Sequence, residues 1–306
     1  MTDILDATPG TPGRRPVRIG LDAPSASRVL RNRLAAVLVY AAFGVALVPL
    51  VWILASVVGQ GWHLLVEPTW WTNSQRNINP DKVGGGAYHA VYGTVIQAIA
   101  CTVIAVPLAL FTAIYLVEYG RGRLARLVSF MVDILTGIPS IVAALFVYAL
   151  WVTTLGLERV GFAVSLSLVL LMIPVVVRST EEMLKLVPNE LREASYALGV
   201  PKWKTIARIV LPTAMGGIVT GVMLGLARVM GETAPLLILG PYAASINSDL
   251  FGGNMAALPT MIKENFGLPD QPAVDRMWAS ALTLILIVLL LNLVGRFVAR
   301  FSGVRR

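Results

Sequence analysis

The chain has 306 residues, of which 56% are hydrophobic and only 14% are charged, and its formal net charge is +8. Its mean hydropathy is +0.74. Because about a quarter of the residues in an ordinary soluble domain are charged, this composition excludes that class of protein. Cys101 is the only cysteine, which also excludes a disulfide framework and a thiolate metal site.

Apolar blocks long enough to cross a bilayer, which takes about 20 residues per helix, recur along the chain. They cover residues 34–58, 91–117, 128–152, 161–177, 213–240 and 278–298. We therefore predict an all-α membrane protein, with six transmembrane helices in one transmembrane domain of residues 29–306. Residues 1–28 carry Pro, Gly, Arg and Asp without an apolar run, and we expect a disordered cytoplasmic arm that touches membrane lipid.

The basic residues are distributed unevenly over the segments between these blocks. With six spans, the segments on one side hold 19 of the 25 Lys and Arg residues, the other side holds five, and Arg228 lies inside a span. The positive-inside rule then places both termini in the cytoplasm. The net charge therefore indicates topology, and we expect no nucleic-acid partner.

The third block is interrupted by Gly137-Ile138-Pro139-Ser140. A proline kinks or ends a helix, and the backbone groups that it frees persist in a membrane only where protein or a water-filled cavity satisfies them. We expect Gly137 and Pro139 to form either a gate or a packing kink, and the sequence leaves both open. Asp133, near the cytoplasmic end of this block, is expected to reach water.

The polar segment 178–212 departs from everything before it. Arg178 is expected to end the fourth span, Thr180 to start a short helix, and Glu181-Glu182 to be solvated. A second helix starts at Pro188-Asn189 and stops at Gly199 in a left-handed conformation. A third helical piece runs from Pro201 to Leu211-Pro212.

The fifth block combines small residues with charge. At about 100° per residue, the glycines share one helical face with the charges and with Pro235. Small-x-x-x-small spacing lets two membrane helices approach closely, so this face is expected to meet another helix or a pore. An arginine in mid-bilayer costs at least about 2.5–3.5 kcal/mol, which an i,i+4 ion pair relieves in part. The residues concerned are Gly217, Gly221, Gly225, Arg228 and Glu232.

One spacing in the polar segment carries a resemblance. Glu193-Ala194-Ser195 is followed after three residues by Gly199, and after nine more by Ile209-Val210-Leu211-Pro212. This pattern resembles the signature of permease subunits of bacterial ABC importers, which have a MetI-like fold; the signature has alanine where Ser195 stands. The resemblance implies that Glu193, Ala194, Ser195, Gly199, Leu211 and Pro212 couple the chain to an ATP-binding subunit. An apolar face of Leu191, Tyr196 and Leu198 also favours a protein interface there, whereas the alternative is an ordinary amphipathic loop helix.

Three further runs narrow the resemblance. Gly137-Ile138-Pro139-Ser140, Arg178-Ser179-Thr180-Glu181-Glu182 and Arg228-x-x-Gly231-Glu232-Thr233-Ala234-Pro235 resemble the PstA-type permease of the phosphate ABC importer, over roughly residues 30–300. The resemblance implies a heterodimer with a PstC-type permease, two PstB-type ATPase subunits and an extracytoplasmic phosphate-binding protein. It also implies a bacterial cytoplasmic membrane location and a substrate pathway through Arg178, Arg228, Glu232 and Thr233.

The chemistry of the fifth block fits an oxyanion. A guanidinium binds a tetrahedral oxyanion through two parallel hydrogen bonds. A carboxylate only accepts hydrogen bonds, so Glu232 favours an anion with a P–OH group and repels sulfate, which has no proton to donate. We therefore predict that Arg228 attracts phosphate and that Glu232 selects the protonated anion.

The chain has no Gly-x-x-x-x-Gly-Lys-Ser/Thr phosphate loop, so we expect ATP to be bound and hydrolysed by partner subunits, with no cofactor or enzyme activity in this chain. Neither histidine, His63 or His89, has a carboxylate cluster around it, so no metal site is expected. The alternative functions are a permease for sulfate, molybdate or another oxyanion, a secondary transporter or channel, and a non-transporting scaffold or sensor. Co-purification with an ATPase separates an importer from the last two.

Overall fold

The computed structural model describes residues 26–302, which form helices joined by turns and loops, with no strand in that range. The predicted all-α class is thus confirmed for these residues. The described chain divides after Leu54 into two units, which we describe separately. The helices are α1 (Ala26–Leu65), α2 (Pro68–Thr72), α3 (Tyr88–Ile114), α4 (Gly122–Gly137), α5 (Ser140–Tyr148), α6 (Gly161–Lys185), α7 (Asn189–Ala197), α8 (Lys202–Thr205), α9 (Leu211–Met230), α10 (Ala234–Leu239), α11 (Leu258–Asn265) and α12 (Gln271–Ser302), with π-helical segments η1 (Tyr115–Tyr119), η2 (Ala149–Thr154) and η3 (Ile206–Val210).

The first unit consists, in its described part, of the apolar α1 up to Leu54. The helix begins at Ala26, so the last three residues assigned to the disordered arm are helical, and the rest of the arm lies outside the described residues. Pro49 lies inside α1, in keeping with the tolerance of membrane helices for proline.

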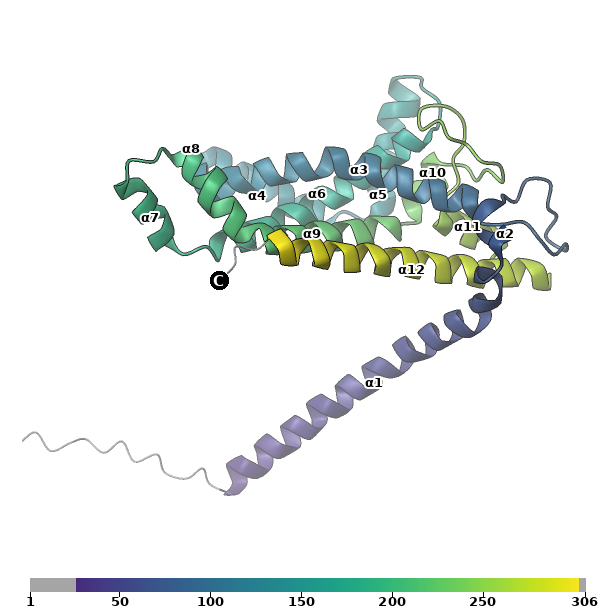
Figure 1. The fold of residues 1–306 in the computed structure, drawn as a ribbon, viewed down its shortest axis with the longest axis horizontal. Coiled ribbons are helices and arrows are strands. Elements are labelled where there is room, and N and C mark those ends of the chain that lie inside the picture. The colour runs from purple at the N-terminus through teal and green to yellow at the C-terminus, as the bar shows by residue number, and fades with distance from the viewer. Residues whose placement is uncertain (1–25, 303–306) are drawn as a thin grey trace, which may run out of the picture. The chain divides into compact units, whose positions relative to one another are not determined.

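The second unit is a bundle in which α3, α6, α9 and α12 run side by side (Figure 1). Helix α6 is its centre, because apolar residues surround much of it and are buried on several sides; examples are Val164, Leu168, Met172 and Val176. Figure 1 shows α7 and α8 at one end of this bundle, and α2 and α11 at the other. We call these the α7 end and the α11 end.

The predicted break in the third block is present. Helices α4 and α5 meet at Ile138-Pro139 with a bend of 106°. In the part of the chain that the structure describes, five helices are long and apolar enough to cross a membrane, and the bent pair makes up to six if it counts as one span. The choice between a gate and a packing kink stays open, since the bend fits both.

Helix boundaries around the polar segment differ from the prediction. Helix α6 continues through Arg178 and Thr180 to Lys185, because Arg178 finds partners on α4 and the polar residues after it form helix readily. Gly199 ends the next helix with φ +74, as predicted. The third helical piece does not stop at Leu211-Pro212: the chain is helical from Lys202 to Met230, and Pro212 lies in the first turn of α9, directly after the π-helical segment η3.

The fifth span also differs from the expected continuous helix of residues 213–240. Helix α9 ends at Met230, and α10 starts at Ala234. Pro235 favours this break, because it has no N–H to donate to residue 231 and it is well suited to the first turn of a new helix, where it lies in α10. The face predicted from 100° steps therefore applies up to Arg228 and not to Glu232 or Pro235.

The glycines of α9 lie against α6. A Cβ on Gly217 would meet Met183, one on Gly225 would lie 3.2 Å from Val176, and one on Gly221 would come within 1.9 Å of the Ser179 hydroxyl and 2.6 Å of its Cβ. Small residues at this interface thus let the two backbones approach closely, which is how helices associate in an apolar environment.

We predict that Gly221→Ala lowers stability by about 1–3 kcal/mol, because the added methyl group overlaps Ser179 and the backbones must separate. The measurement is equilibrium unfolding of the purified protein in mixed detergent micelles. Gly216→Ala on the same helix is the matched control, since its Cβ meets nothing nearer than 3.7 Å. Adding Ser179→Gly should rescue Gly221→Ala; equal unfolding of the two alanine variants would contradict the packing argument.

Candidate functional site

The break between α9 and α10 holds one of the two charged clusters that the sequence singled out. Arg228 occupies the last turn of α9, and Glu232 and Thr233 lie in the break. The Arg228 Nε and a Glu232 carboxylate oxygen are 3.8 Å apart. The predicted ion pair is therefore present, although it is too long for a hydrogen bond.

Arg228 keeps its donors open. Its side chain is 49% exposed and that of Glu232 is 17% exposed within this chain. Among the described residues, no hydrogen bond to the Arg228 guanidinium is found, and Glu232 is its one ion-pair partner. A planar fork with free N–H groups beside a carboxylate is able to take a tetrahedral oxyanion bidentately.

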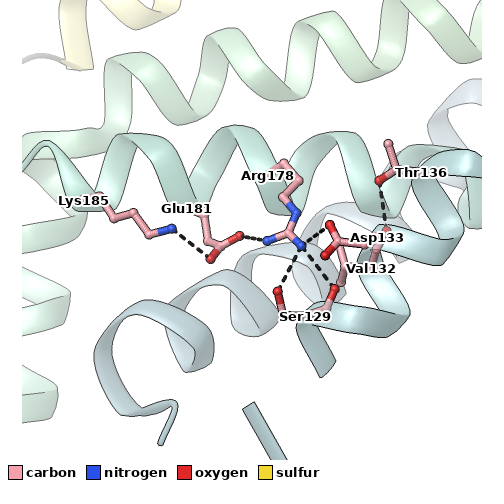
Figure 2. A network of polar contacts seen from close by, with 7 residues as sticks. All are labelled: Ser129, Val132, Asp133, Thr136, Arg178, Glu181 and Lys185. Atoms are coloured by element: carbon pink, nitrogen blue, oxygen red, sulfur yellow. Dashed lines mark hydrogen bonds and ion pairs between the residues drawn. The ribbon is translucent and has the colours of Figure 1, made fainter. Parts of the chain in front are cut away.

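Arg178, the other predicted pathway arginine, is in a different state (Figure 2). Its guanidinium binds the carboxylates of Asp133 and Glu181, and one of its nitrogens also donates to the hydroxyl and carbonyl oxygens of Ser129, at 3.0 and 3.1 Å. Lys185 binds the second oxygen of Glu181 at 3.2 Å. This network holds α6 against α4, on the α4 side of the bend between α4 and α5.

The expectation for Glu181 is wrong, whereas those for Glu182, which is exposed, and for Asp133 are confirmed. Glu181 is not solvated: its side chain is 9% exposed, and it is bound by Arg178 and Lys185. Asp133 does reach water, but it also pairs with Arg178. Sequence reasoning missed the pair of Asp133 and Arg178 because these residues are far apart in the chain, and only the folded bundle brings them together. Arg178 and Lys185 stand at i,i+3 and i,i+4 spacing from Glu181, so that local signal could have been found once the helix was known to continue.

The predicted coupling residues lie at the α7 end. Ser195 is buried, and its hydroxyl is 2.8 Å from that of Thr205 on α8, so the serine replaces the alanine of the signature with a hydrogen bond between two short helices. Glu193 and Ala194 are exposed on α7. Large apolar side chains are exposed over the same region, among them Leu186, Leu191, Tyr196, Leu198 and Trp203. Such a patch is typical of a surface that another protein covers.

The α11 end has a polar cluster that the sequence did not reveal. The buried Arg276 of α12 donates to the carbonyl oxygens of Lys82 and Pro80, at 2.8 and 2.9 Å, and so fixes the loop before α3. Nearby, the Tyr242 hydroxyl donates to Gln75 at 2.9 Å. Burial, together with the charge of Glu264, raises the pKa of Tyr242, so this phenol stays protonated and keeps its donor role.

Comparisons with known proteins agree with one another. Residues 105–305 match the family described as "Binding-protein-dependent transport system inner membrane component". The phosphate transport system permease protein PstA 1 of Mycobacterium tuberculosis (strain ATCC 25618 / H37Rv) is 55% identical over 279 residues, which are 91% of this chain and 90% of that protein.

Two solved structures share the fold. A chain of the bacterial alginate ABC transporter, in complex with its alginate-bound periplasmic protein, gives a TM-score of 0.63 at 15% identity, over 91% of this chain and 99% of that one. A chain of the inward-facing MetNI methionine ABC transporter gives 0.56 at 20% identity, over 72% and 95%. At these identities the likeness concerns the fold alone, and it confirms the MetI-like architecture.

We predict that Glu181→Gln lowers the free energy of unfolding by about 1–3 kcal/mol, since hydrogen bonds to buried charged groups are lost. Asp133→Asn should cost less than about 1 kcal/mol, because this carboxylate is largely exposed and water screens the pair. Equilibrium unfolding in mixed micelles measures both. A larger effect for Asp133→Asn than for Glu181→Gln would show that burial does not rank the two partners.

Proposed function

The chain belongs to the binding-protein-dependent transport system inner membrane components, and within them to the PstA-type phosphate transport permeases; from this premise we propose that its own cargo is inorganic phosphate. It is the permease subunit of an ABC importer, a membrane protein and not an enzyme, and it works within a transporter complex. The observation that carries the phosphate assignment is Arg228, whose guanidinium has open donors beside Glu232 at a helix break.

The two arginines of the predicted pathway have different roles in this proposal. Arg178 is neutralised by two carboxylates, so it has little attraction left for a passing anion and mainly joins α6 to α4. Arg228 has one distant carboxylate and open donors. Discontinuous membrane helices commonly flank transport sites, because the break leaves polar groups where a substrate passes. Arg228 therefore attracts the anion, and Glu232 accepts the P–OH hydrogen bond.

Partners complete the transporter in this proposal. A PstC-type permease lies across the pathway from this chain, and two PstB-type subunits bind and hydrolyse ATP at the α7 end. The exposed apolar residues of α7 and α8 support a protein partner at that end. An extracytoplasmic phosphate-binding protein delivers the anion to the α11 end.

The same proposal fixes the orientation. The α7 end carries Lys185, Arg192, Lys202, Lys204 and Arg208, and the positive-inside rule places such a segment in the cytoplasm. The protein is then a multi-pass component of the bacterial cytoplasmic membrane, with both termini inside. The residue set of the substrate pathway is Arg228, Glu232 and Thr233, with Arg178 as the structural member.

We predict that Arg228→Gln lowers ATP-dependent phosphate uptake by at least about tenfold, the size expected when hydrogen bonds from a charged donor are lost. Uptake is measured with the complete transporter, including the binding protein, in reconstituted vesicles. Arg159→Gln, at an exposed arginine in the turn before α6, is the matched control and should leave uptake unchanged. Normal uptake by Arg228→Gln would overturn the assignment of this arginine.

We predict that Glu232→Gln removes discrimination between phosphate and sulfate, because the amide no longer repels an anion without a proton. A binding protein would filter the anions first, so the measurement uses the purified pair of permease subunits alone. Phosphate should raise the thermal unfolding midpoint of the wild type more than sulfate does, and the two anions should act equally on Glu232→Gln. Unchanged discrimination would remove the selecting role of Glu232.

A further inference from the structure

One arginine on α7 joins three helices. The Arg192 side chain is 13% exposed, and its Nε and one Nη donate to the same Glu118 carboxylate oxygen, at 3.1 and 2.8 Å. The same Nη donates to the Leu184 carbonyl near the end of α6 at 3.0 Å, and the other Nη donates to the Val187 carbonyl at 2.6 Å. Arg192 thus ties α7 both to the end of α6 and to the segment that follows α3.

The acceptor of this pair is unusually well buried for a carboxylate. The Glu118 side chain is 5% exposed, and Glu118 lies in η1, the π-helical turn that continues α3. Among the described residues, Glu118 is the one acidic partner of Arg192. Removing either charge from such a pair leaves the other buried and uncompensated, so the two side chains hold each other in place.

A second set of contacts joins α8 to the π-helical segment η1. The ammonium group of Lys202 donates to the backbone carbonyl of Glu118 and lies 4.7 Å from the centre of the Tyr119 ring. That distance is typical of a cation–π contact. The two short helices on either side of Gly199 are therefore both fastened to residues 118 and 119.

These contacts matter because, within residues 26–302, no other hydrogen bond or ion pair joins α3 or η1 to α7 or α8. Helix α7 follows α6 through the short segment 186–188, and α8 continues through η3 into α9. The backbone therefore transmits a displacement of α7 to both α6 and α9. Glu118 precedes Arg192 by 74 residues, and its connection to α7 goes through side chains. Without the Arg192 and Lys202 contacts, a displacement of α7 would move α6 and α9 through the backbone, and it would move α3 only through the packing of side chains.

We propose that Glu118 and Arg192, supported by Lys202 and Tyr119, are positioning residues that make α3 move together with α7 and α8, so that closure of the ATPase subunits drives α3, α6 and α9 as one body. This proposal rests on the proposed function, since it concerns how ATP hydrolysis is coupled to phosphate movement. Glu118 and Arg192 touch neither substrate nor nucleotide in it. They act through the helices that they join.

The test compares two rates in the same vesicles containing the complete transporter: phosphate uptake and ATP hydrolysis. In Glu118→Gln and in Arg192→Lys, the uptake per ATP hydrolysed should fall about tenfold, within the range that residues along a coupling network contribute. Glu118→Asp keeps the charge and should recover part of the ratio. Glu182→Gln, at an exposed carboxylate of α6 near the same end, is the matched control and should keep the wild-type ratio.

An unchanged ratio in both variants overturns the proposal. It is also overturned if uptake and hydrolysis fall together by the same factor, because the pair then serves assembly alone. If Glu118→Gln fails to assemble with its partners, Lys202→Gln and Tyr119→Leu decide, since they remove the second set of contacts and leave the buried pair intact. A wild-type transporter that hydrolyses ATP without moving phosphate would refute the proposed function and not this coupling role.

Discussion

A guanidinium inside an apolar helix bundle needs oxygen partners or water, and the bundle is organised by how each arginine meets that need. Arg178 is held by Asp133 and Glu181, Arg192 by Glu118 and helix-end carbonyls, and Arg276 by the carbonyls of the loop before α3. The contacts of Arg178 with Asp133, of Arg192 with Glu118 and of Arg276 with the loop before α3 join segments that are distant in the chain. Because leaving such a charge unpaired is costly, the contacts restrict which helices can separate.

Arg228 is the exception that points to function. Arg228 lies in the last turn of α9, and a single carboxylate at 3.8 Å offsets only part of the cost of a charge in an apolar span. A well-packed apolar side chain in its place would stabilise the helix better. In the proposed function this charge attracts the passing anion, and an oxyanion matches the open donors of the guanidinium. Arg178 is already paired with two carboxylates, so the proposal gives it mainly the role of joining α6 to α4.

Sequence and structure agree where a signal is local. Apolar length predicted α3, α6 and α12, and Gly199 was recognised as a left-handed helix stop because a single residue type suffices. The prediction was wrong at the end of the fourth span, where Arg178 was expected to leave the helix and instead pairs with α4. Glu118 went unnoticed because no periodicity relates residues 74 positions apart. Only tertiary contacts distinguish a solvated charge from a paired one.

One continuous helix connects the α7 end of the bundle with the break between α9 and α10. From Lys202 to Met230 the chain is helical over 29 residues, so η3 and α9 connect the α7 end with the break at Gly231. At about 1.5 Å per residue this rod spans roughly 40 Å, comparable to a bilayer with its headgroups. The glycine contacts with α6 prevent α9 from rotating freely, because Met183 and Ser179 fill the space beside Gly217 and Gly221. In the proposed function, a displacement at α7 is therefore delivered along the helix axis to Arg228, the residue to which the proposal assigns the anion.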